Sequence, residues 1–235
     1  MPLPQLSVPK FELELPSTGQ KLNYRPFLVK EEKILLMAME GENVQEIMNA
    51  VSHIIDNCIT EELDTQILPT FDIEYIFLKL RSKSVNEFAE VSFKCEKCET
   101  PNKHNINLEE IEISKTETHS NMIQLDSNIG MQMRYPTTKL MQNINTENRE
   151  DISHVFDIVE NCVEMIFDDD DSYIMDDYTK KEKEEFFNNL TQKQFEKIQE
   201  FFTTMPKLQH IINQTCTDCG HEEEITLEGL TNFFG

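Results

Sequence analysis

The pattern Cys-x-x-Cys occurs twice in this chain of 235 residues, first at Cys95 and Cys98 and again at Cys216 and Cys219. The surrounding sequences are CEKCETPNKHNINLEEI and CTDCGHEEEITLEGL, and both continue through a short polar stretch into Ile-x-Leu-Glu. A segment with a strand-like pattern precedes each copy, EFAEVSFK before the first and LQHIINQT before the second. The repeated unit therefore predicts a strand, a cysteine pair in a tight turn, and a second strand.

Two such hairpins predict one structural zinc site. Each pair supplies two thiolates, and a closed zinc site needs four, at about 2.3 Å from the metal in a tetrahedron. Closing a loop of ~120 residues costs roughly 4 kcal/mol of chain entropy, whereas structural zinc contributes on the order of 10–16 kcal/mol. The long separation therefore does not prevent Cys95, Cys98, Cys216 and Cys219 from sharing one Zn²⁺ ion in a zinc ribbon.

Other interpretations of the cysteines stay open at this stage. His104 and His221 lie close to the pairs and could each replace a thiolate. A thioredoxin-like redox pair opens a helix, whereas both pairs here precede a polar loop and a predicted strand. Two reduced, metal-free pairs are a further alternative. Cys58 and Cys162 stand singly in helical patterns and are expected to be small buried apolar residues.

The rest of the chain alternates between strand and helix patterns. Residues 10–27 predict a β-hairpin with a turn at PSTGQ, and residues 34–55 predict two helices with a break at Gly41. A helix that is apolar nearly all round is predicted to follow Thr70 as its N-cap and to be buried. Further predicted elements are strands at residues 87–94, 130–136 and 208–215, an amphipathic helix at 150–167, and two helices N-capped by Thr179 and Thr191.

These elements predict an α+β fold with an N-terminal β-hairpin and helices, a split zinc ribbon, and a mainly helical insertion between its halves. The expected divisions are residues 1–86 for the hairpin and helical region, 87–113 and 207–235 for the two halves of the ribbon, and 114–206 for the insertion.

The formal net charge of −23 restricts the classes of partner. Nucleic-acid binders rely on Lys and Arg to displace counterions, so we expect neither nucleic acid nor anionic membrane as a partner. A basic protein surface suits this charge better, although a solvated surface without any partner is the alternative. The longest apolar run, ILLMAM, is far below the roughly 20 residues that span a bilayer. The first ten residues hold three prolines and no apolar signal-peptide region, so the cysteines are expected in a reducing compartment.

We expect no catalysis, because four cysteines would leave zinc no open position for water. The chain has no Gly-rich phosphate loop, nucleophile elbow or His-Glu-x-x-His motif. Four consecutive aspartates at residues 168–171 lack the glycine and terminal glutamate of an EF-hand loop and are expected to be solvated. Phe233 and Phe234 at the C-terminus are expected to pack against the ribbon, with binding of a partner as the alternative.

Long blocks of the sequence resemble the baseplate hub proteins of T-even-type contractile-tailed bacteriophages. The blocks are YRPFLVKEEKILLMAME, FDIEYIFLKLRSKSV, the first cysteine pair, YTKKEKEEFFNNLTQKQFEKIQEFFTTMPKL and LEGLTNFFG, and the likeness runs over residues 13–235. It implies a structural or assembly subunit of the hub, made in the host bacterial cytoplasm and located in the virion tail baseplate. Its implied partners are other hub and tail-tube proteins, with a homo-oligomer left open, and it supplies no catalytic residues.

Two function classes compete with this interpretation. The cysteine pairs alone would also suit a zinc-ribbon adaptor of the transcription machinery or a dithiol oxidoreductase. The resemblance does not supply the zinc site, which is predicted from the spacing in this sequence.

Overall fold

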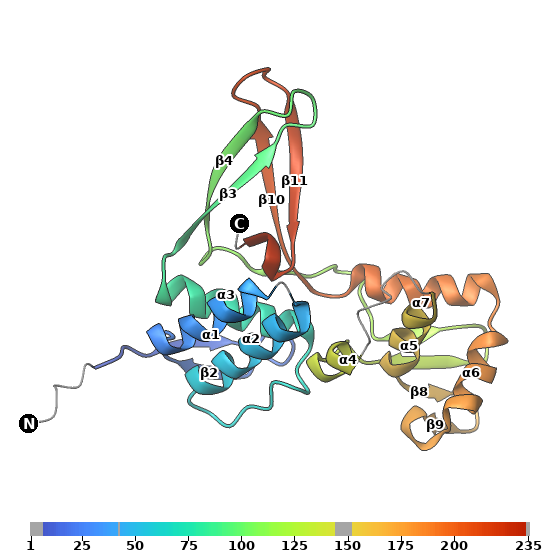
Figure 1. Cartoon of the computed structure of the whole chain (residues 1–235). Coiled ribbons are helices and arrows are strands. Elements are labelled where there is room, and N and C mark those ends of the chain that lie inside the picture. Colours follow the sequence, from blue (N-terminus) through green and yellow to red (C-terminus); the bar gives the residue numbers. More distant parts are fainter. Residues whose placement is uncertain (1–6, 42, 144–151, 234–235) are drawn as a thin grey trace, which may run out of the picture. The chain divides into compact units, whose positions relative to one another are not determined.

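The computed structural model describes residues 7–41, 43–143 and 152–233, and these form a mixed α+β fold (Figure 1). The chain divides into two compact units. Unit 1 comprises Met1–Ser114 and Lys207–Gly235, and unit 2 comprises Lys115–Pro206. The α+β class is as predicted, while the separation of residues 1–86 from the cysteine-bearing hairpins within unit 1 stays a prediction. None of the described helices has the length and apolar character that a transmembrane span requires.

Unit 1 begins with the predicted hairpin. Strands β1 (Phe11–Glu14) and β2 (Lys21–Tyr24) pair antiparallel with Leu13 opposite Leu22, and both leucines are buried. Gly19 occupies the turn with φ of +73°, a conformation that costs glycine little because it has no Cβ. The alternation of apolar and charged residues therefore does place one face of this hairpin in the core.

Three helices follow in unit 1: α1 (Val29–Glu40), α2 (Val44–Cys58) and α3 (Thr70–Ser84). Helix α3 is buried as predicted, and its fully buried residues include Ile73, Phe77 and Leu80. The predicted cap is displaced by one residue, because Pro69 is the N-cap and Thr70 is already helical. The buried carboxylate of Asp72 accepts hydrogen bonds from the backbone N–H and the hydroxyl of Ser17, which ties α3 to the β1–β2 turn.

Two long hairpins carry the cysteine pairs. The first hairpin consists of β3 (Phe88–Lys94) and β4 (Pro101–Asn107), and the second of β10 (Lys207–Thr215) and β11 (Glu222–Glu228). A short strand β5 (Ile113–Ser114) pairs with the start of β10, where Ile113 lies opposite Leu208, and a 3₁₀ helix η3 (Leu230–Phe233) follows β11. The first hairpin is a sheet of its own, so no β-ladder among the described strands joins it to the second.

Unit 2 contains more sheet than the sequence predicted. Its antiparallel sheet has the order β6-β7-β8-β9, of which only β7 (Gly130–Met133) was expected. The other strands are β6 (Met122–Gln124), β8 (Val163–Phe167) and β9 (Ser172–Ile174). The helices are α4 (Thr138–Asn143), α5 (Ile152–Cys162), α6 (Lys180–Asn188) and α7 (Gln192–Thr204), with a 3₁₀ turn η2 (Met175–Asp177).

The single helix predicted at residues 150–167 is wrong, because α5 ends at Cys162 and β8 begins at Val163. Pairing with β7 decides this: Ile166 lies opposite Met131, and Val163 opposite Met133, so β8 buries Val163 and Ile166 in the core of unit 2. Strand preference of such a segment depends on the neighbours it packs against, which a local pattern does not contain.

The predicted N-caps of the last two helices are confirmed. Thr179 caps α6 and Thr191 caps α7, each in a capping box that a residue three positions later completes, Glu182 for α6 and Gln194 for α7. Both helices contribute to the core of unit 2 through buried residues such as Phe187 and Phe201.

Candidate metal centre

The four paired cysteines come together at the tips of the two hairpins. The Sγ atoms of Cys95 and Cys219 are 3.7 Å apart, and those of Cys98 and Cys216 are 3.5 Å apart. All four sulfur atoms lie within 4.8 Å of one another. Each close contact joins one hairpin to the other, so the cluster draws on both distant parts of the chain.

These spacings fit a tetrahedral metal site better than disulfides. Four sulfurs at about 2.3 Å from a zinc ion are separated from each other by about 3.8 Å, whereas a disulfide brings two sulfurs to about 2.05 Å. The four cysteines are free thiols, of which Cys95 and Cys216 are buried. The donor set is therefore the one that structural zinc sites use, and no ligand position is left over for water.

The two tips have the same backbone geometry. In the first, the N–H of Cys95 donates to the carbonyl of Thr100 at 3.0 Å, and the N–H of Glu99 donates to Cys95 at 2.9 Å. The equivalent bonds in the second tip are 2.8 Å from Cys216 to His221 and 3.0 Å from Gly220 to Cys216. The repeat noticed in the sequence is thus also a repeat of conformation.

One residue in each tip is in the left-handed region, at the position after the second cysteine. Gly220 has φ of +68° there, and Glu99 has φ of +58° as a non-glycine residue. A side chain in this region costs on the order of 1 kcal/mol. Glu99 therefore holds a strained conformation in the tip that brings Cys95 and Cys98 to one point.

A buried asparagine joins the two hairpins beside the cysteines. Asn102 on β4 is 4% exposed, and its Oδ1 accepts from the backbone N–H of Thr217 at 2.9 Å and from the Thr217 hydroxyl at 3.0 Å. Its Nδ2 donates to the carbonyl of Thr100 at 2.9 Å and lies 3.7 Å from the Sγ of Cys216. Outer groups of this kind orient metal ligands. Nothing in the cysteine spacing pointed to Asn102, although its place four residues after Cys98 is a local clue.

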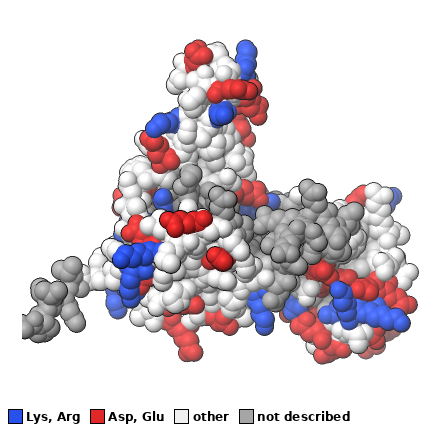
Figure 2. All heavy atoms as spheres, viewed as in Figure 1, with Lys and Arg blue, Asp and Glu red and all other residues white. Residues whose placement is uncertain are grey.

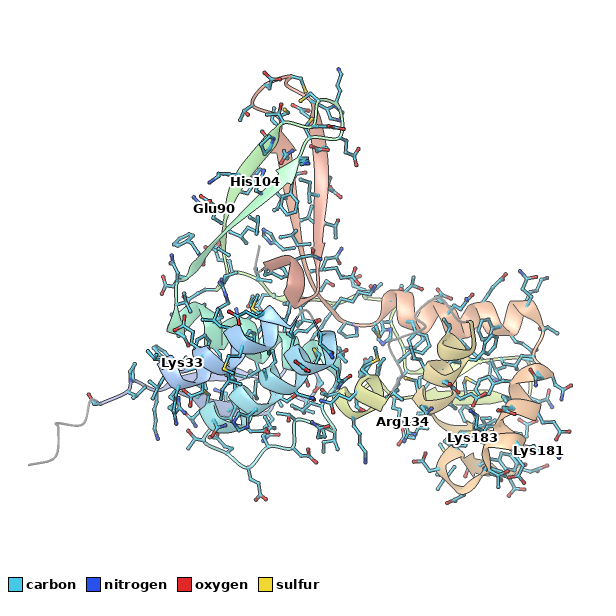
Figure 3. The ribbon with its side chains drawn as sticks, in the orientation of Figure 1. Lys33, Glu90, His104, Arg134, Lys181 and Lys183 are labelled. Atoms are coloured by element: carbon cyan, nitrogen blue, oxygen red, sulfur yellow. The ribbon has the colours of Figure 1, made fainter. Side chains whose placement is uncertain are left out.

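Neither of the two histidines considered as replacement ligands belongs to the sulfur cluster. His104, labelled in Figure 3, lies with its Nε2 at 2.7 Å from the Oε1 of Gln214, which is buried on β10. Gln214 in turn donates to the carboxylate of Glu223 at 2.5 Å. His221 groups with Glu96 and Glu223, not with the sulfur atoms. Within the described residues, sulfur alone makes up the four-ligand group.

Hydrogen bonding within the second tip and between the thiols shifts the pKa values of Cys216 and Cys219 in opposite directions. Backbone hydrogen bonds from Cys219 and Asp218 lower the pKa of Cys216 to about 6. At Cys219 a backbone hydrogen bond from His221 lowers the pKa. Hydrogen bonds with the neighbouring thiols raise it by more, so the net effect is a rise to about 12. Thiolates so close together repel, and a bound divalent ion would deprotonate all of them.

The unpaired cysteines are buried, as predicted. Cys58 is 1% exposed and Cys162 is fully buried. Burial raises the pKa of the Cys58 thiol to about 11 and that of Cys162 to about 12. Both remain protonated at neutral pH, so neither is a reactive thiol.

Two further sets of predicted positions are the C-terminal phenylalanines and the four consecutive aspartates. Phe233 is fully buried within the chain, and Phe234 lies outside the described residues, so binding of a partner by this pair stays a prediction. The four aspartates form the β8–β9 turn, where the Asp168 carboxylate accepts from the backbone N–H groups of Asp170 and Asp171. In the described part of the chain, these aspartates belong to no metal-binding group.

Comparison with curated proteins and with solved structures gives no match. One family model does match, and it extends over residues 8–235. Its description is "T4 bacteriophage base plate protein". Since the match covers nearly the whole chain, including both cysteine pairs, the chain belongs to the T4 bacteriophage base plate protein family and is a component of the virion tail baseplate.

Proposed function

We propose that this chain is a structural or assembly subunit of the baseplate hub, and that one zinc ion joins its two hairpins into a split ribbon. The observation that carries the proposal is the meeting of four cysteines from hairpins far apart in the sequence, in a chain whose match to the base plate family spans residues 8–235. The role as a subunit rests on the family, and the zinc rests on the geometry of Cys95, Cys98, Cys216 and Cys219.

Zinc would give the hairpins a stability that they do not have alone. An isolated two-stranded hairpin is marginally stable in water, and no β-ladder joins these two in the described structure. Side-chain bonds through Asn102 and Gln214 link them, but each net hydrogen bond contributes only about 1 kcal/mol. A four-sulfur site would hold the two hairpins rigidly together. It would also link the two segments of unit 1, which precede and follow unit 2 in the sequence.

The expected partners are other hub and tail-tube proteins. With a net charge of −23, the chain is better suited to basic protein surfaces than to nucleic acid. A zinc ion held by four sulfurs has no open position for water or substrate, so we propose no catalytic role. A homo-oligomer is compatible with the same surfaces. No observation favours the transcription adaptor or the oxidoreductase.

Deleting the gene from the phage tests the assignment. We expect infected cells to lack complete baseplates and to yield few infectious particles, and a wild-type copy supplied in trans to restore both. The wild-type chain should co-purify with tail intermediates and be detected in purified particles. Normal tail assembly and normal infectivity of the deletion would refute the role as a baseplate subunit.

The zinc part of the proposal has its own test in the same complementation assay. A copy carrying Cys95→Ser should restore assembly less well than wild type, with a larger deficit at high growth temperature, because the hairpins lose a ligand that fixes them together. A copy carrying Asn105→Ala, an exposed change on the same hairpin, should complement normally. Full complementation by Cys95→Ser at every temperature would count against a structural metal.

A further inference from the structure

Unit 2 contains a cavity that the proposed function does not use. Its volume is about 350 Å³, near the lower end of ligand-binding pockets. It lies between the β8–β9 hairpin, η2 and α6, and its walls are mostly apolar or aromatic. The apolar lining consists of Ile129, Ile166, Tyr173, Met175, Tyr178 and Phe186.

The two carboxylates in the wall are already engaged, and Lys183 is the one basic residue that lines the cavity. Asp168 accepts a hydrogen bond from the Tyr173 hydroxyl at 2.9 Å, and Glu182 accepts from the backbone and hydroxyl of Thr179 at 2.8 and 2.7 Å. The space between these carboxylates is therefore lined mainly by apolar and aromatic side chains. Such an interior favours a large hydrophobic side chain over a polar ligand.

The surface around the cavity is strongly acidic. Residues 168–186 contain nine Asp or Glu and three Lys, which leaves six negative charges in this segment. Asp169, Asp170, Asp171 and Asp177 are exposed. Figure 2 shows acidic side chains gathered beside lysines on the face of unit 2 that it presents. A phosphate or carboxylate ligand would be repelled at such a rim, whereas Lys and Arg would be attracted.

Among the described strands, the cavity also adjoins an edge of the sheet. Strand β9 is the last strand in the order β6-β7-β8-β9, and Ile174 on it is 52% exposed, with Tyr178 nearby at 39%. An exposed edge strand can accept an extended peptide by main-chain pairing. The apolar interior, the acidic rim and the open edge together describe a site for a peptide segment.

We propose that this cavity binds one large apolar side chain, aromatic or aliphatic, from a Lys- and Arg-rich segment of another protein. The apolar anchor fills the space between Tyr173, Met175 and Phe186. Its basic neighbours face Asp168 in the wall and the exposed aspartates next to lining residues in the sequence, at 169–171 and 177. Interfaces commonly concentrate their affinity in one such buried anchor, and the charges favour the rate and specificity of association. The inference rests on the proposed function in assigning that segment to another tail protein.

Two lysines of α6 supply a matched pair of variants (Figure 3). Lys183 lines the cavity, so Lys183→Trp places an indole across its opening, while Lys181 is exposed and does not line it. A displayed library of random dodecapeptides is selected on the full zinc-loaded chain, and the enriched peptides are synthesised. Their affinities are then measured for the wild type and for both variants, after their thermal midpoints have been compared.

The enriched peptides should combine one Phe, Tyr, Trp, Leu or Met with at least two Lys or Arg within three residues. Lys183→Trp should weaken their binding at least tenfold, and Lys181→Trp less than twofold. The absence of enrichment, enrichment without basic residues, or equal binding by both variants would overturn the proposal.

A double variant leaves the apolar lining of the cavity unchanged and tests the acidic residues around it. Asp170→Lys combined with Asp177→Lys should weaken binding about tenfold at 50 mM NaCl, and the difference should shrink at 500 mM because salt screens exposed charges. A loss that is independent of salt would contradict the electrostatic argument. If the chain self-associates and Lys183→Trp abolishes that association, the occupant of the cavity is a second copy of this chain. That result would overturn the proposal of a different protein as the partner. Since the selection uses the isolated chain, its failure would leave the proposed function standing.

Discussion

Replacing Asn102 with alanine should weaken the link between the two hairpins while all four paired cysteines stay in place. Asn102 is buried, and its side-chain oxygen accepts both bonds from Thr217 on the opposite hairpin, at 2.9 and 3.0 Å. Its amide also satisfies the carbonyl of Thr100, which lies in the tip that carries Cys98. The substitution removes these three hydrogen bonds at once and leaves the Thr217 N–H and the Thr100 carbonyl without this partner.

The magnitude follows from those bonds. Each contributes a net of about 1 kcal/mol, and burying an unsatisfied backbone group costs more, so the free energy of unfolding should fall by roughly 3 kcal/mol. Loss of an outer group that orients metal ligands typically lowers metal affinity by about 10–100-fold. Asn102→Ala should therefore lower both the thermal midpoint and the zinc affinity, the latter measured by competition with a chromophoric chelator.

Asn105→Ala is the matched control, because Asn105 is on the same strand and exposed. We expect its unfolding free energy to change by less than about 0.5 kcal/mol and its zinc affinity to stay at the wild-type value. If Asn102→Ala and Asn105→Ala behave alike, Asn102 neither couples the hairpins nor orients the metal ligands.

Cys95→Ser and Cys216→Ser should lower the thermal midpoint by similar amounts, since each leaves a shared metal with three sulfurs; clearly unequal losses would show that the two pairs do not share an ion. Burial raises the pKa of Glu74 from 4.5 to about 7, so the folded state holds more protons between these pH values and stability falls as pH rises through them. Glu74→Gln should therefore raise the free energy of unfolding at pH 8, by up to about 3 kcal/mol, and have little effect at pH 4; equal effects at both pH values in urea titrations would contradict this. Gly130→Ala would place a Cβ 2.3 Å from the ring of Phe167, so it should destabilise the chain by about 1–3 kcal/mol in the same titrations. Adding Phe167→Leu should restore part of that loss, and a neutral Gly130→Ala would show that the ring moves aside freely.

The cysteine cluster was predictable because its chemistry is local and repeated. A pair at Cys-x-x-Cys spacing directs two thiolates to one point, and two pairs complete a tetrahedral set wherever the chain can close. The same holds for the N-caps at Thr179 and Thr191, where a hydroxyl and a side chain three residues later satisfy each other. Interactions within a few residues can be read directly from the sequence.

Contacts between distant segments were harder to predict. Residues 152–167 suit a helix by local pattern, but β7 pairs with residues 163–167 and makes them a strand. The bond between His104 and Gln214 likewise depends on how two hairpins face each other, which neither hairpin encodes alone. The cavity in unit 2 arises from a turn, a strand and a helix, and the acidic run was its one visible sign in the sequence.

The number and kind of atoms bound to the metal decide whether the four cysteines share one ion. We predict that protein purified without chelators contains one zinc ion per chain, and that X-ray absorption at the zinc edge shows four sulfur neighbours at about 2.3 Å. Metal-free protein, a nitrogen or oxygen neighbour in the first shell, or two ions per chain would contradict a single site formed by Cys95, Cys98, Cys216 and Cys219.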